Sequence, residues 1–345
     1  MEQNHFHIDF PAEWAPQSGV MLTWPHRQTD WRNMLEEVIP CFTAIAKEIV
    51  RKEKLLIVCS SVREVKQALG GADCSRIIFR EIPSNDTWAR DHGPLSVYVN
   101  GTPFVLDFTF NGWGLKFPAN YDNQITRRLY ESGVFSPETG YQSLLHLVLE
   151  GGSIESDGAG TLLTTSKCLL SVNRNEYKTK EEINDYLSLI LGVRRILWLD
   201  HGYLAGDDTD SHIDTLARFC GRETIAYLKC TDETDEHYRE LSLMEAELGN
   251  FKTEAGKPYR LIPLPMAEAV YFEGERMPAT YANFLIINGA VLMPAYGSPS
   301  DELARQKLQE AFPGREIIGI NCLPLIKQHG SLHCVTMQIP VPLNS

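Results

Sequence analysis

Amphipathic helical segments alternate with short apolar runs along the 345 residues of the chain. Five segments have helical periodicity, several with Ser, Asp or Thr near the start and Gly soon after the end: 63–69, 121–133, 178–192, 232–248 and 300–312. A β-branched or Leu-rich run follows each of them: "IIFREI", "LHLVLEG", "RRILWL", "YRLIPLP" and "REIIGINC". Five returns of a helix-then-strand unit, at a period of roughly 60–70 residues, predict an α/β fold made of repeats, such as a propeller.

Turn and breaker residues punctuate this pattern. Three segments indicate hairpins, each with two strand-like runs around a turn pair: 95–110 around Asn100-Gly101, 284–297 around Asn288-Gly289, and 152–165 around Asp157-Gly158. The two Asn-Gly pairs predict type I′ turns, in which both central residues have φ > 0. Pro40 lies inside the apolar stripe of a further helical segment, 33–50, and predicts a kink or a break there.

Composition indicates an ordinary globular protein, with 43% hydrophobic and 22% charged residues. No linker-like stretch divides the chain, so we expect a single catalytic domain over residues 1–345. The N-terminal residues lack the basic and apolar regions of a signal peptide, and no apolar run approaches the ~18–20 residues that a membrane span requires. We therefore expect a cytoplasmic protein that has no membrane partner.

The cysteines and the charge narrow the class of protein further. Eight Cys occur without a CxxC pair and without a His spaced as a zinc partner, so we expect neither a disulfide framework nor a structural metal, and no cofactor. A net charge of −13 argues against a nucleic-acid partner. The same charge would attract a cationic substrate, although many proteins are acidic merely for solubility.

Four segments carry candidate chemistry, and the first is "SNDTWARDHGP" (84–94) between two predicted strands. Turns favour Gly, Pro, Asn and Asp but have no need of Trp or Arg. Asp86, Trp88 and Asp91 are therefore candidate site residues. The competing interpretation is a salt bridge between Arg90 and Asp91, with Trp88 filling a gap in the core.

Two further segments supply an acid and a base. In "LEGGSI" (149–154), Glu150 ends an apolar run beside two glycines, which would let a ligand approach the backbone unless they only form a bend. In "GDDTDSHIDTLARF" (206–219), His212 is flanked by carboxylates, and on a strand His212 and Asp214 would share one face. A His flanked by carboxylates suits general acid/base catalysis. A hard-cation site is the alternative, although the calcium-loop pattern is absent.

The fourth candidate is Cys334 in "QHGSLHCVTMQ" (328–338), where an isolated cysteine is more often a buried hydrophobe than a nucleophile. The interval from Asp91 to Glu150 is similar to that from Glu150 to His212, and the interval to Cys334 is about twice as long. Residues at similar offsets in a ring of repeats would meet at its centre. This spacing makes Cys334 a candidate nucleophile.

A cysteine, a histidine and several carboxylates without a metal suit one substrate class in particular. Carboxylates bind a guanidinium through bidentate hydrogen bonds, and a thiolate forms more readily beside such a cation. We therefore predict attack by Cys334, loss of ammonia to leave an amidino-cysteine, and hydrolysis by a water that His212 deprotonates.

Six motifs now support a resemblance that runs from about Phe10 to Gln338: "NDTWARDHGP", "FNGWG", "LEGGSIESDGAGTLLTT", "DSHID", "YANFLIINGAVLMPAYG" and "GSLHCVTMQ". In this order they resemble the agmatine deiminase and bacterial-type peptidylarginine deiminase family. That family belongs to the guanidine-modifying superfamily, which is built on a five-bladed α/β propeller. The resemblance implies this fold, a small cationic guanidino substrate, and an assembly that could be a homodimer.

The resemblance also implies residue roles. It makes Cys334 the nucleophile, His212 the general acid/base, and Asp91 and Asp214 the clamp on the guanidinium. Glu150 would help to orient His212 or the substrate. The pocket would be lined by four further residues: Asp86, Trp88, Trp113 and Gly330.

Two departures leave the substrate open. "HGSLHC" replaces the Gly-rich run with Asn that agmatine deiminases usually carry, and "LKFPANYDNQ" follows "FNGWG" directly, as a short loop. We predict hydrolysis of agmatine to N-carbamoylputrescine and ammonia, with deimination of free or peptidyl arginine as the nearest alternative. Three further classes stay open: an amidinotransferase, a non-catalytic guanidine- or amine-binding protein, and a divalent-metal hydrolase using His212, His92 and the nearby Asp residues.

Overall fold

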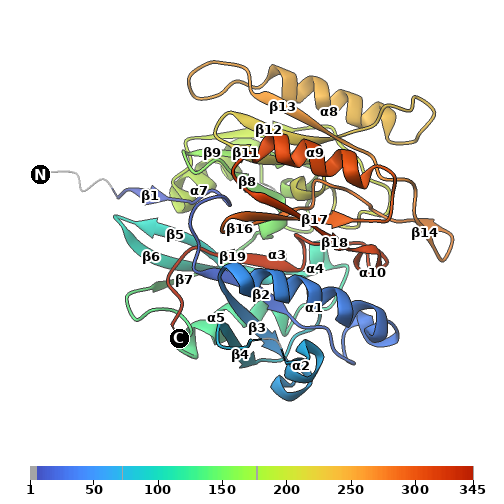
Figure 1. The fold of residues 1–345 in the computed structure, drawn as a ribbon. Helices are drawn as coiled ribbons and strands as arrows, with labels where there is room; N and C mark the ends of the chain where they lie inside the picture. The colour runs from blue at the N-terminus through green and yellow to red at the C-terminus, as the bar shows by residue number, and fades with distance from the viewer. Residues whose placement is uncertain (1–5, 72, 176–177, 345) are drawn as a thin grey trace, which may run out of the picture.

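Helices and strands alternate throughout the computed structural model, which describes residues 6–71, 73–175 and 178–344 (Figure 1). The predicted α/β class is confirmed. No helix in these ranges is both long and apolar enough to cross a membrane.

Five sheets of three or four strands make up most of the structure. In order along each sheet, the strands of the two larger sheets are β19 (Thr336–Ile339), β2 (Gly19–Thr23), β3 (Lys54–Cys59) and β4 (Ile77–Glu81), and β1 (Ile8–Asp9), β5 (Leu95–Val99), β6 (Thr102–Thr109) and β7 (Gly140–Val148). The three smaller sheets are β8 (Ile154–Ser156), β9 (Thr161–Thr165) and β10 (Arg195–Leu199); β11 (Ala217–Gly221), β12 (Thr224–Lys229) and β13 (Arg260–Pro265); and β16 (Leu285–Ile287), β17 (Ala290–Ala295) and β18 (Glu316–Asn321). A separate hairpin pairs β14 (Tyr271–Phe272) with β15 (Glu275–Arg276).

The same connection recurs in each sheet. An antiparallel pair of strands is followed by a helix and then by a parallel strand, as in β8, β9, α7 and β10. The helices that make these connections are α1 (Leu35–Lys52), α2 (Val62–Leu69), α5 (Ile125–Glu131), α7 (Lys180–Leu191), α8 (Tyr238–Asn250) and α9 (Asp301–Ala311). The predicted helix-then-strand repeat is therefore confirmed, and β19 closes the pattern by pairing with β2.

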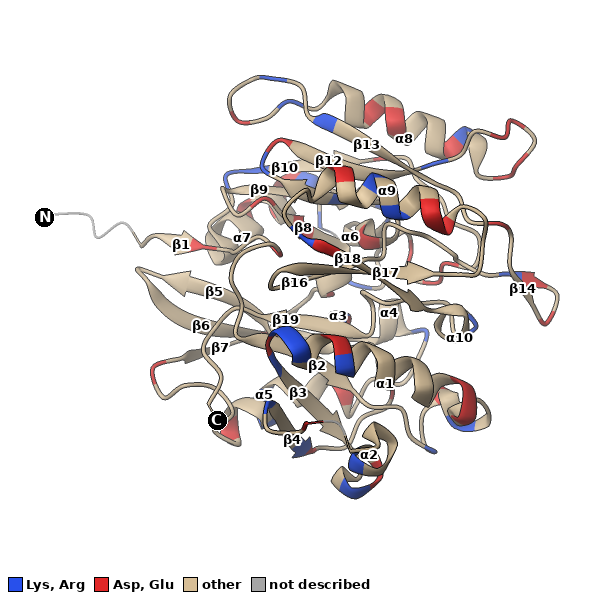
Figure 2. Ribbon diagram, in the orientation of Figure 1, with Lys and Arg blue, Asp and Glu red and all other residues tan. Residues whose placement is uncertain are grey.

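Local sequence signals account for the helix ends. Thr179 and Glu182 form a capping box at the start of α7, and Gly192 ends the helix with φ 68°. Charged residues of both signs lie on outer helices such as α1, α8 and α9, whereas the central strands β16 and β19 carry none (Figure 2). Each outer helix thus buries one face against a sheet and leaves a charged face in solvent.

Two local predictions were wrong: the break at Pro40, where the alternative of a kink stays a prediction, and one of the two type I′ turns. The α1 helix continues past Pro40 without a break, because the buried face that includes Phe42 and Ile45 outweighs one lost backbone hydrogen bond. The β16–β17 hairpin forms, but only Gly289 of its Asn-Gly pair has φ > 0. The Asn288 side chain is committed elsewhere, since its Nδ2 donates to the Gln17 carbonyl oxygen (2.8 Å).

Short helical turns lie between the sheets and carry the candidate site. They are α3 (Ala89–His92), α4 (Gly112–Leu115), α6 (Ser166–Leu169), α10 (Leu323–Ile326), η1 (Asp30–Asn33), η2 (Asp122–Gln124), η3 (Gly151–Ser153) and η4 (Ile213–Thr215). Among them, α3 packs against η3 and η3 packs against η4, while α3 also contacts β19. Segments far apart in the sequence therefore meet at the middle of the molecule (Figure 1).

Candidate active site

Cys334 lies in a buried turn two residues before β19, with 5% of its surface exposed. Its carbonyl oxygen accepts a hydrogen bond from the backbone N–H of Arg90 (3.1 Å), and its backbone N–H donates to Asn283 Oδ1 (3.3 Å). The thiol Sγ lies 3.8 Å from Asp214 Oδ2. Burial, with the negative charges of Asp214 and Asp91, raises the pKa of the thiol well above its usual value. Without a nearby cation, Cys334 is therefore protonated.

Asp91 is the first of two carboxylates beside the thiol. Its Oδ2 accepts a hydrogen bond from Trp113 Nε1 (2.9 Å), and its Oδ1 accepts one from the backbone N–H of Gly152 (3.0 Å). Burial and the neighbouring Asp214 and Glu150 raise the pKa of Asp91 well above its usual value. A bound cation would reverse both this shift and that of the thiol, so the site is built for positive charge.

His212 lies directly before η4 rather than on a strand, so the predicted strand geometry was wrong. The side chains of Thr209 and Thr215 close a turn here: Thr209 Oγ1 accepts from the His212 N–H (3.1 Å), and Thr215 Oγ1 donates to the His212 carbonyl (2.8 Å). The imidazole is 1% exposed, and burial lowers its pKa to about 3. Neither ring nitrogen has a hydrogen-bond partner within the described structure, and Asp91 Oδ1 is 3.7 Å from Nδ1. His212 is therefore a neutral base with an unused lone pair.

Asp214 lies within η4 and is the second carboxylate beside the thiol. Its Oδ2 accepts a hydrogen bond from His333 Nδ1 (2.8 Å), and Oδ1 has no partner among the described residues. Burial alone would raise the pKa of Asp214, but the hydrogen bond and charge of His333 outweigh it and lower the pKa. Asp214 therefore stays ionised and has one unpaired oxygen. Neither Asp214 nor His212 is among the residues that line the cavity described below.

Glu150 precedes η3 and does not line the cavity described below. It forms a bidentate ion pair with Arg174 Nε (2.8 and 3.0 Å), and Arg174 also bonds Asp210 Oδ2 (2.6 Å). Burial raises the pKa of Glu150 despite the arginine. Side-chain atoms of Glu150, Cys168 and His212 lie within 4.8 Å of one another, so Glu150 supports the wall behind His212.

Position 152, in the middle of the site, has no room for a side chain. A Cβ placed on it would lie 2.7 Å from His212 Nδ1, 2.8 Å from Asp91 Oδ1 and 3.1 Å from Asp214 Oδ2. Any side chain here would push these three side chains away from the backbone. Gly152 thus permits a close approach of these side chains to the backbone, rather than only forming a bend.

A cavity of about 210 Å³ opens onto Cys334 and Asp91. All four predicted pocket residues line it: Asp86, Trp88, Trp113 and Gly330. Other lining residues are Asp30, Phe117, Asp208, Thr209, Thr215, Gln328 and His329. Among the described residues that line this cavity, none is Lys or Arg.

Two of the lining residues are held by unusually close contacts. A Cβ on Gly330 would lie 2.1 Å from the Trp88 ring, so the glycine lets the indole pack against the backbone. Trp113 has φ 55° and lies edge-on to Phe110 and Phe117. Trp88 also belongs to the main hydrophobic core, as the competing interpretation of its segment expected.

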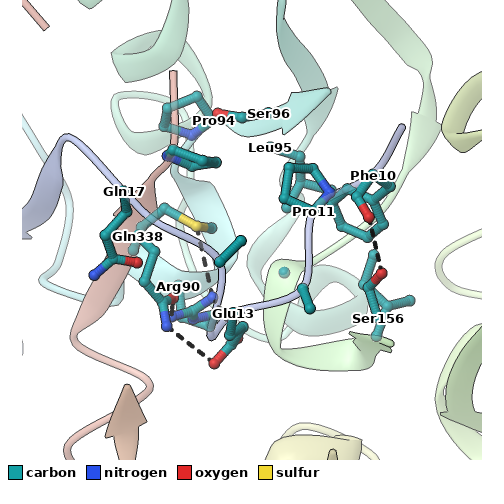
Figure 3. A pocket seen from close by; sticks show the side chains of 16 residues that line it. Phe10, Pro11, Glu13, Gln17, Arg90, Pro94, Leu95, Ser96, Ser156 and Gln338 are labelled. Atoms are coloured by element: carbon teal, nitrogen blue, oxygen red, sulfur yellow. Dashed lines mark hydrogen bonds and ion pairs between the residues drawn. The ribbon is translucent and has the colours of Figure 1, made fainter. Parts of the chain in front are cut away.

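Arg90 pairs with Glu13 (3.1 Å) and not with Asp91, so the alternative salt bridge is wrong. Figure 3 shows this pair, together with Gln338, at a second cavity of about 50 Å³. Glu13 Oε1 also lies 2.8 Å from His333 Nε2, and both Glu13 and Glu155 pair with the buried Arg218.

The sequence motifs did not indicate this network, in which Glu13, Glu155 and Arg218 surround His333 and His333 holds Asp214. They also did not indicate Asn283 or Arg174. The available signals were the His-Cys pair itself for His333 and the "YANF" motif for Asn283. Nothing local marked Glu13, Arg174 or Arg218.

The donor sets near the site suit arginine pairing better than a metal. Two groups of His, Cys and acidic side chains cluster within 4.8 Å among the described residues: Glu150, Cys168 and His212, and Glu13, Glu155 and His333. Arg174 pairs with the first group and Arg218 with the second. Neither group contains His92, which the metal-hydrolase alternative requires.

Comparisons with known proteins agree with this geometry. The family model described as Porphyromonas-type peptidyl-arginine deiminase matches residues 9–340. The agmatine deiminase of Stutzerimonas stutzeri is 35% identical over 356 residues, covering 96% of this chain and 95% of the relative.

Solved structures are similar over almost the whole chain. A Porphyromonas gingivalis protein, named as a candidate arginine deiminase, is 54% identical with a TM-score of 0.94 and covers 98% of this chain and 100% of its own. A Cys-to-Ser variant of the C. jejuni agmatine deiminase with substrate bound is 36% identical with a TM-score of 0.92, covering 100% and 99%.

Proposed function

The chain belongs to the Porphyromonas-type peptidyl-arginine deiminase family, and from this premise we propose that it hydrolyses agmatine to N-carbamoylputrescine and ammonia. One observation carries the choice of substrate. The cavity is lined by the thiol of Cys334, by Asp91 and by three further carboxylates (Asp30, Asp86 and Asp208), with no Lys or Arg among its described lining residues. Agmatine is a dication with a guanidinium at one end and an amine at the other.

We call Cys334, Asp91, His212 and Asp214 the guanidinium end of the site. Asp91, which lines the cavity, would accept guanidinium N–H groups, and the unpaired Oδ1 of Asp214, whose carboxylate lies beside the thiol, would accept another. The substrate charge then lowers the raised pKa values of Asp91 and Cys334, so that binding itself favours the thiolate. Charge pairing at the buried end thereby couples binding to activation of the nucleophile.

The chemistry divides into two half-reactions. In the first, His212 takes the thiol proton, Cys334 Sγ bonds to the guanidinium carbon, and one C–N bond breaks. His212 returns its proton to the departing nitrogen, which leaves as ammonia, and a cationic amidino group remains on the sulfur. The low pKa of His212 suits this role because the imidazole is neutral at the start.

In the second half-reaction, water loses a proton to His212 and its oxygen bonds to the amidino carbon. The C–S bond breaks, giving the thiol and the carbamoyl product. The proton on His212 passes to solvent, where ammonia takes it up. No step requires a cofactor.

We call Asp30, Asp86, Asp208, Gln328 and His329 the distal end of the site. Burial and the charges of Asp122 and Asp30 raise the pKa of Asp86 to about 8, whereas Asp214 and Glu150 act on Asp91. The pKa values of Asp86 and Asp91 are thus raised by different neighbouring charges. A distal ammonium would be paired here, and the α-carboxylate of arginine would meet carboxylates with no compensating cation.

Deimination of free or peptidyl arginine is the second candidate. The name of the family model and that of the P. gingivalis relative favour it. It requires the same guanidinium end and a different distal end. An amidinotransferase would replace water by an amine, and a non-catalytic binding protein would leave Cys334 without a chemical role.

The finer architecture belongs to the proposal too. Five sheets with one repeated connection, and the pairing of the C-terminal β19 with β2, support five blades of a propeller in one catalytic domain. In that arrangement the segments before and between the sheets face the axis, where the site residues meet. A homodimer and a cytoplasmic location stay predictions.

Ammonia release from agmatine, free arginine and a blocked arginyl peptide, with EDTA present, tests the function. Agmatine alone should be turned over. Cys334→Ser should lower the rate by at least about 10⁴-fold, while the matched control Cys74→Ser, at a thiol outside the cavity, should not. Turnover of an arginine substrate would keep the chemistry and change the substrate, and no turnover of any of the three would overturn the proposal.

A further inference from the structure

His329 stands out at the distal end because its backbone is strained. It is a non-glycine residue with φ 66°, a conformation that L side chains rarely adopt, and its side chain lines the substrate cavity. A glycine would adopt this backbone without strain. Strained residues persist where the surrounding structure holds them, and they concentrate at ligand-binding sites. The imidazole is therefore the feature that needs explanation.

Contacts hold both the imidazole ring of His329 and the backbone next to it. His329 Nδ1 lies 2.8 Å from the carbonyl oxygen of Gly206, and a Cβ on Gly206 would lie 2.5 Å from the carbonyl oxygen of Arg276. On the other side, Gly330 packs against the Trp88 ring. The position of the imidazole in the cavity wall is thus set by rigid backbone contacts.

The contact with Gly206 also sets the tautomer. A carbonyl oxygen can only accept, so Nδ1 carries the hydrogen and neutral His329 presents a lone pair on Nε2. Burial raises the pKa of Asp208 to about 6, and His329, which lines the same cavity, opposes this rise. Lys116, whose charge also acts on Asp208, is already paired with Asp210 (2.7 Å) and with the carbonyl of Asp208 (2.5 Å).

We infer that His329 and Asp208 together form an acceptor pair that selects substrates with an N–H donor at the distal end. This inference rests on the proposed function and adds a specificity-determining residue to it. A primary ammonium offers three N–H groups, of which the Nε2 lone pair and the Asp208 carboxylate would accept one each. A distal carboxylate offers none and would be repelled by Asp208.

Three guanidines separate recognition of the distal group from the chemistry: agmatine, 1-butylguanidine, which has the same chain without the amine, and arginine. His329→Gly removes the ring and relieves the backbone. It should raise KM for agmatine by about tenfold or more, leave kcat within about twofold, and leave kcat/KM for 1-butylguanidine unchanged. Asp208→Asn should act in the same direction.

Glu273→Gly is the matched control, since Glu273 has φ 52° in the β14–β15 turn outside the cavity. It relieves the same kind of strain and should change neither KM nor the preference. An equal loss with agmatine and 1-butylguanidine in His329→Gly would make the ring merely structural and overturn the inference, as would an unchanged KM for agmatine.

A binding measurement tests this inference separately from the proposed function. Calorimetry with the Cys334→Ser protein, with and without His329→Gly, compares agmatine with 1-butylguanidine without any turnover. A selective loss of agmatine affinity supports the inference even if the wild-type protein turns over nothing. Failure to bind either guanidine would overturn the proposed function and this inference together.

Discussion

The two ends of the proposed site differ in their exposure to solvent. At the guanidinium end every side chain is buried: Cys334, Asp91, His212 and Asp214. At the distal end, Asp86, Asp208, Gln328 and His329 are half-buried and Asp30 is exposed. Charges at the first end therefore interact through a less polar medium than charges at the second.

Because of this difference, we expect the two ends of the site to have different roles. Buried, unpaired acceptors are costly unless a cation meets them, so the guanidinium end is committed to one charge and one geometry. The half-buried distal end binds through weaker, screened contacts that can change without disturbing the chemistry. Substitutions at the guanidinium end should lower kcat, and substitutions at the distal end should raise KM.

The largest effect is expected from Asp91→Asn. The variant keeps the shape, but it removes a charge from the guanidinium clamp and sets an amide against the donors Trp113 Nε1 and Gly152 N–H. We expect kcat/KM for agmatine to fall by about 10³-fold or more, mainly in kcat. Steady-state kinetics with Asp30→Asn as the exposed counterpart checks this. A loss below about tenfold would break the comparison between the two ends.

Gly152→Ala tests the geometry of the buried end without removing any functional group. The added methyl would displace His212, Asp91 or Asp214 by several tenths of an ångström, because it would lie 2.7 to 3.1 Å from each. A displacement of this kind should cost about 10²-fold in kcat. Gly249→Ala on α8 is the control, since nothing lies within 4 Å of its Cβ. Comparable kcat values for the two variants would contradict the packing argument.

The repeats, the hairpins and the meeting of four distant segments could be predicted from the sequence. The helical period of α7 and its capping residues are local, so they can be read without knowledge of the fold. The similar intervals between Asp91, Glu150 and His212 indicated a common centre because each residue follows a comparable strand.

The supporting partners could not be predicted, because they depend on pairings across the whole chain. Asp214 is held by His333, 119 residues away, and Glu13 lies 320 residues before His333. Glu150 lies near His212, but its ion pair with Arg174 had no local signal. The turn before η4 shows the same limit, since flanking Thr side chains overrode a strand-like pattern around His212.

A smaller effect should appear in the pH dependence of binding at the distal end. The pKa of Asp86 is raised to about 8, so the protonated carboxyl must lose its proton before it can pair with an ammonium. Agmatine affinity therefore rises with pH and levels off above this value, by about tenfold between pH 7 and 9 from this group alone. Calorimetry on the Cys334→Ser protein avoids titration of the thiol.

The comparison with Asp86→Asn isolates this contribution, since Asp91 also has a raised pKa and titrates in both proteins. The Asn variant should bind agmatine more weakly and show a shallower rise with pH. 1-Butylguanidine, which has no distal amine, should show the same pH dependence in both. An identical slope for agmatine in the two proteins would remove Asp86 from recognition of the amine.

Phe117→Leu should produce the smallest effect among these variants, and it distinguishes apolar contact from charge recognition in the cavity. Phe117 lines the cavity at 39% exposure and contacts Trp113 edge-on with 5.5 Å between ring centroids. Leucine keeps most of the apolar surface, so only the aromatic contact is lost, and KM should rise about twofold to threefold with kcat unchanged. In the proposed binding mode this wall would contact the methylene chain and not the amine, so KM for agmatine and for 1-butylguanidine should rise equally. That equality distinguishes apolar contact from the charge recognition at Asp86 and Asp208, whereas a fall in kcat would show that the wall reaches the reacting carbon.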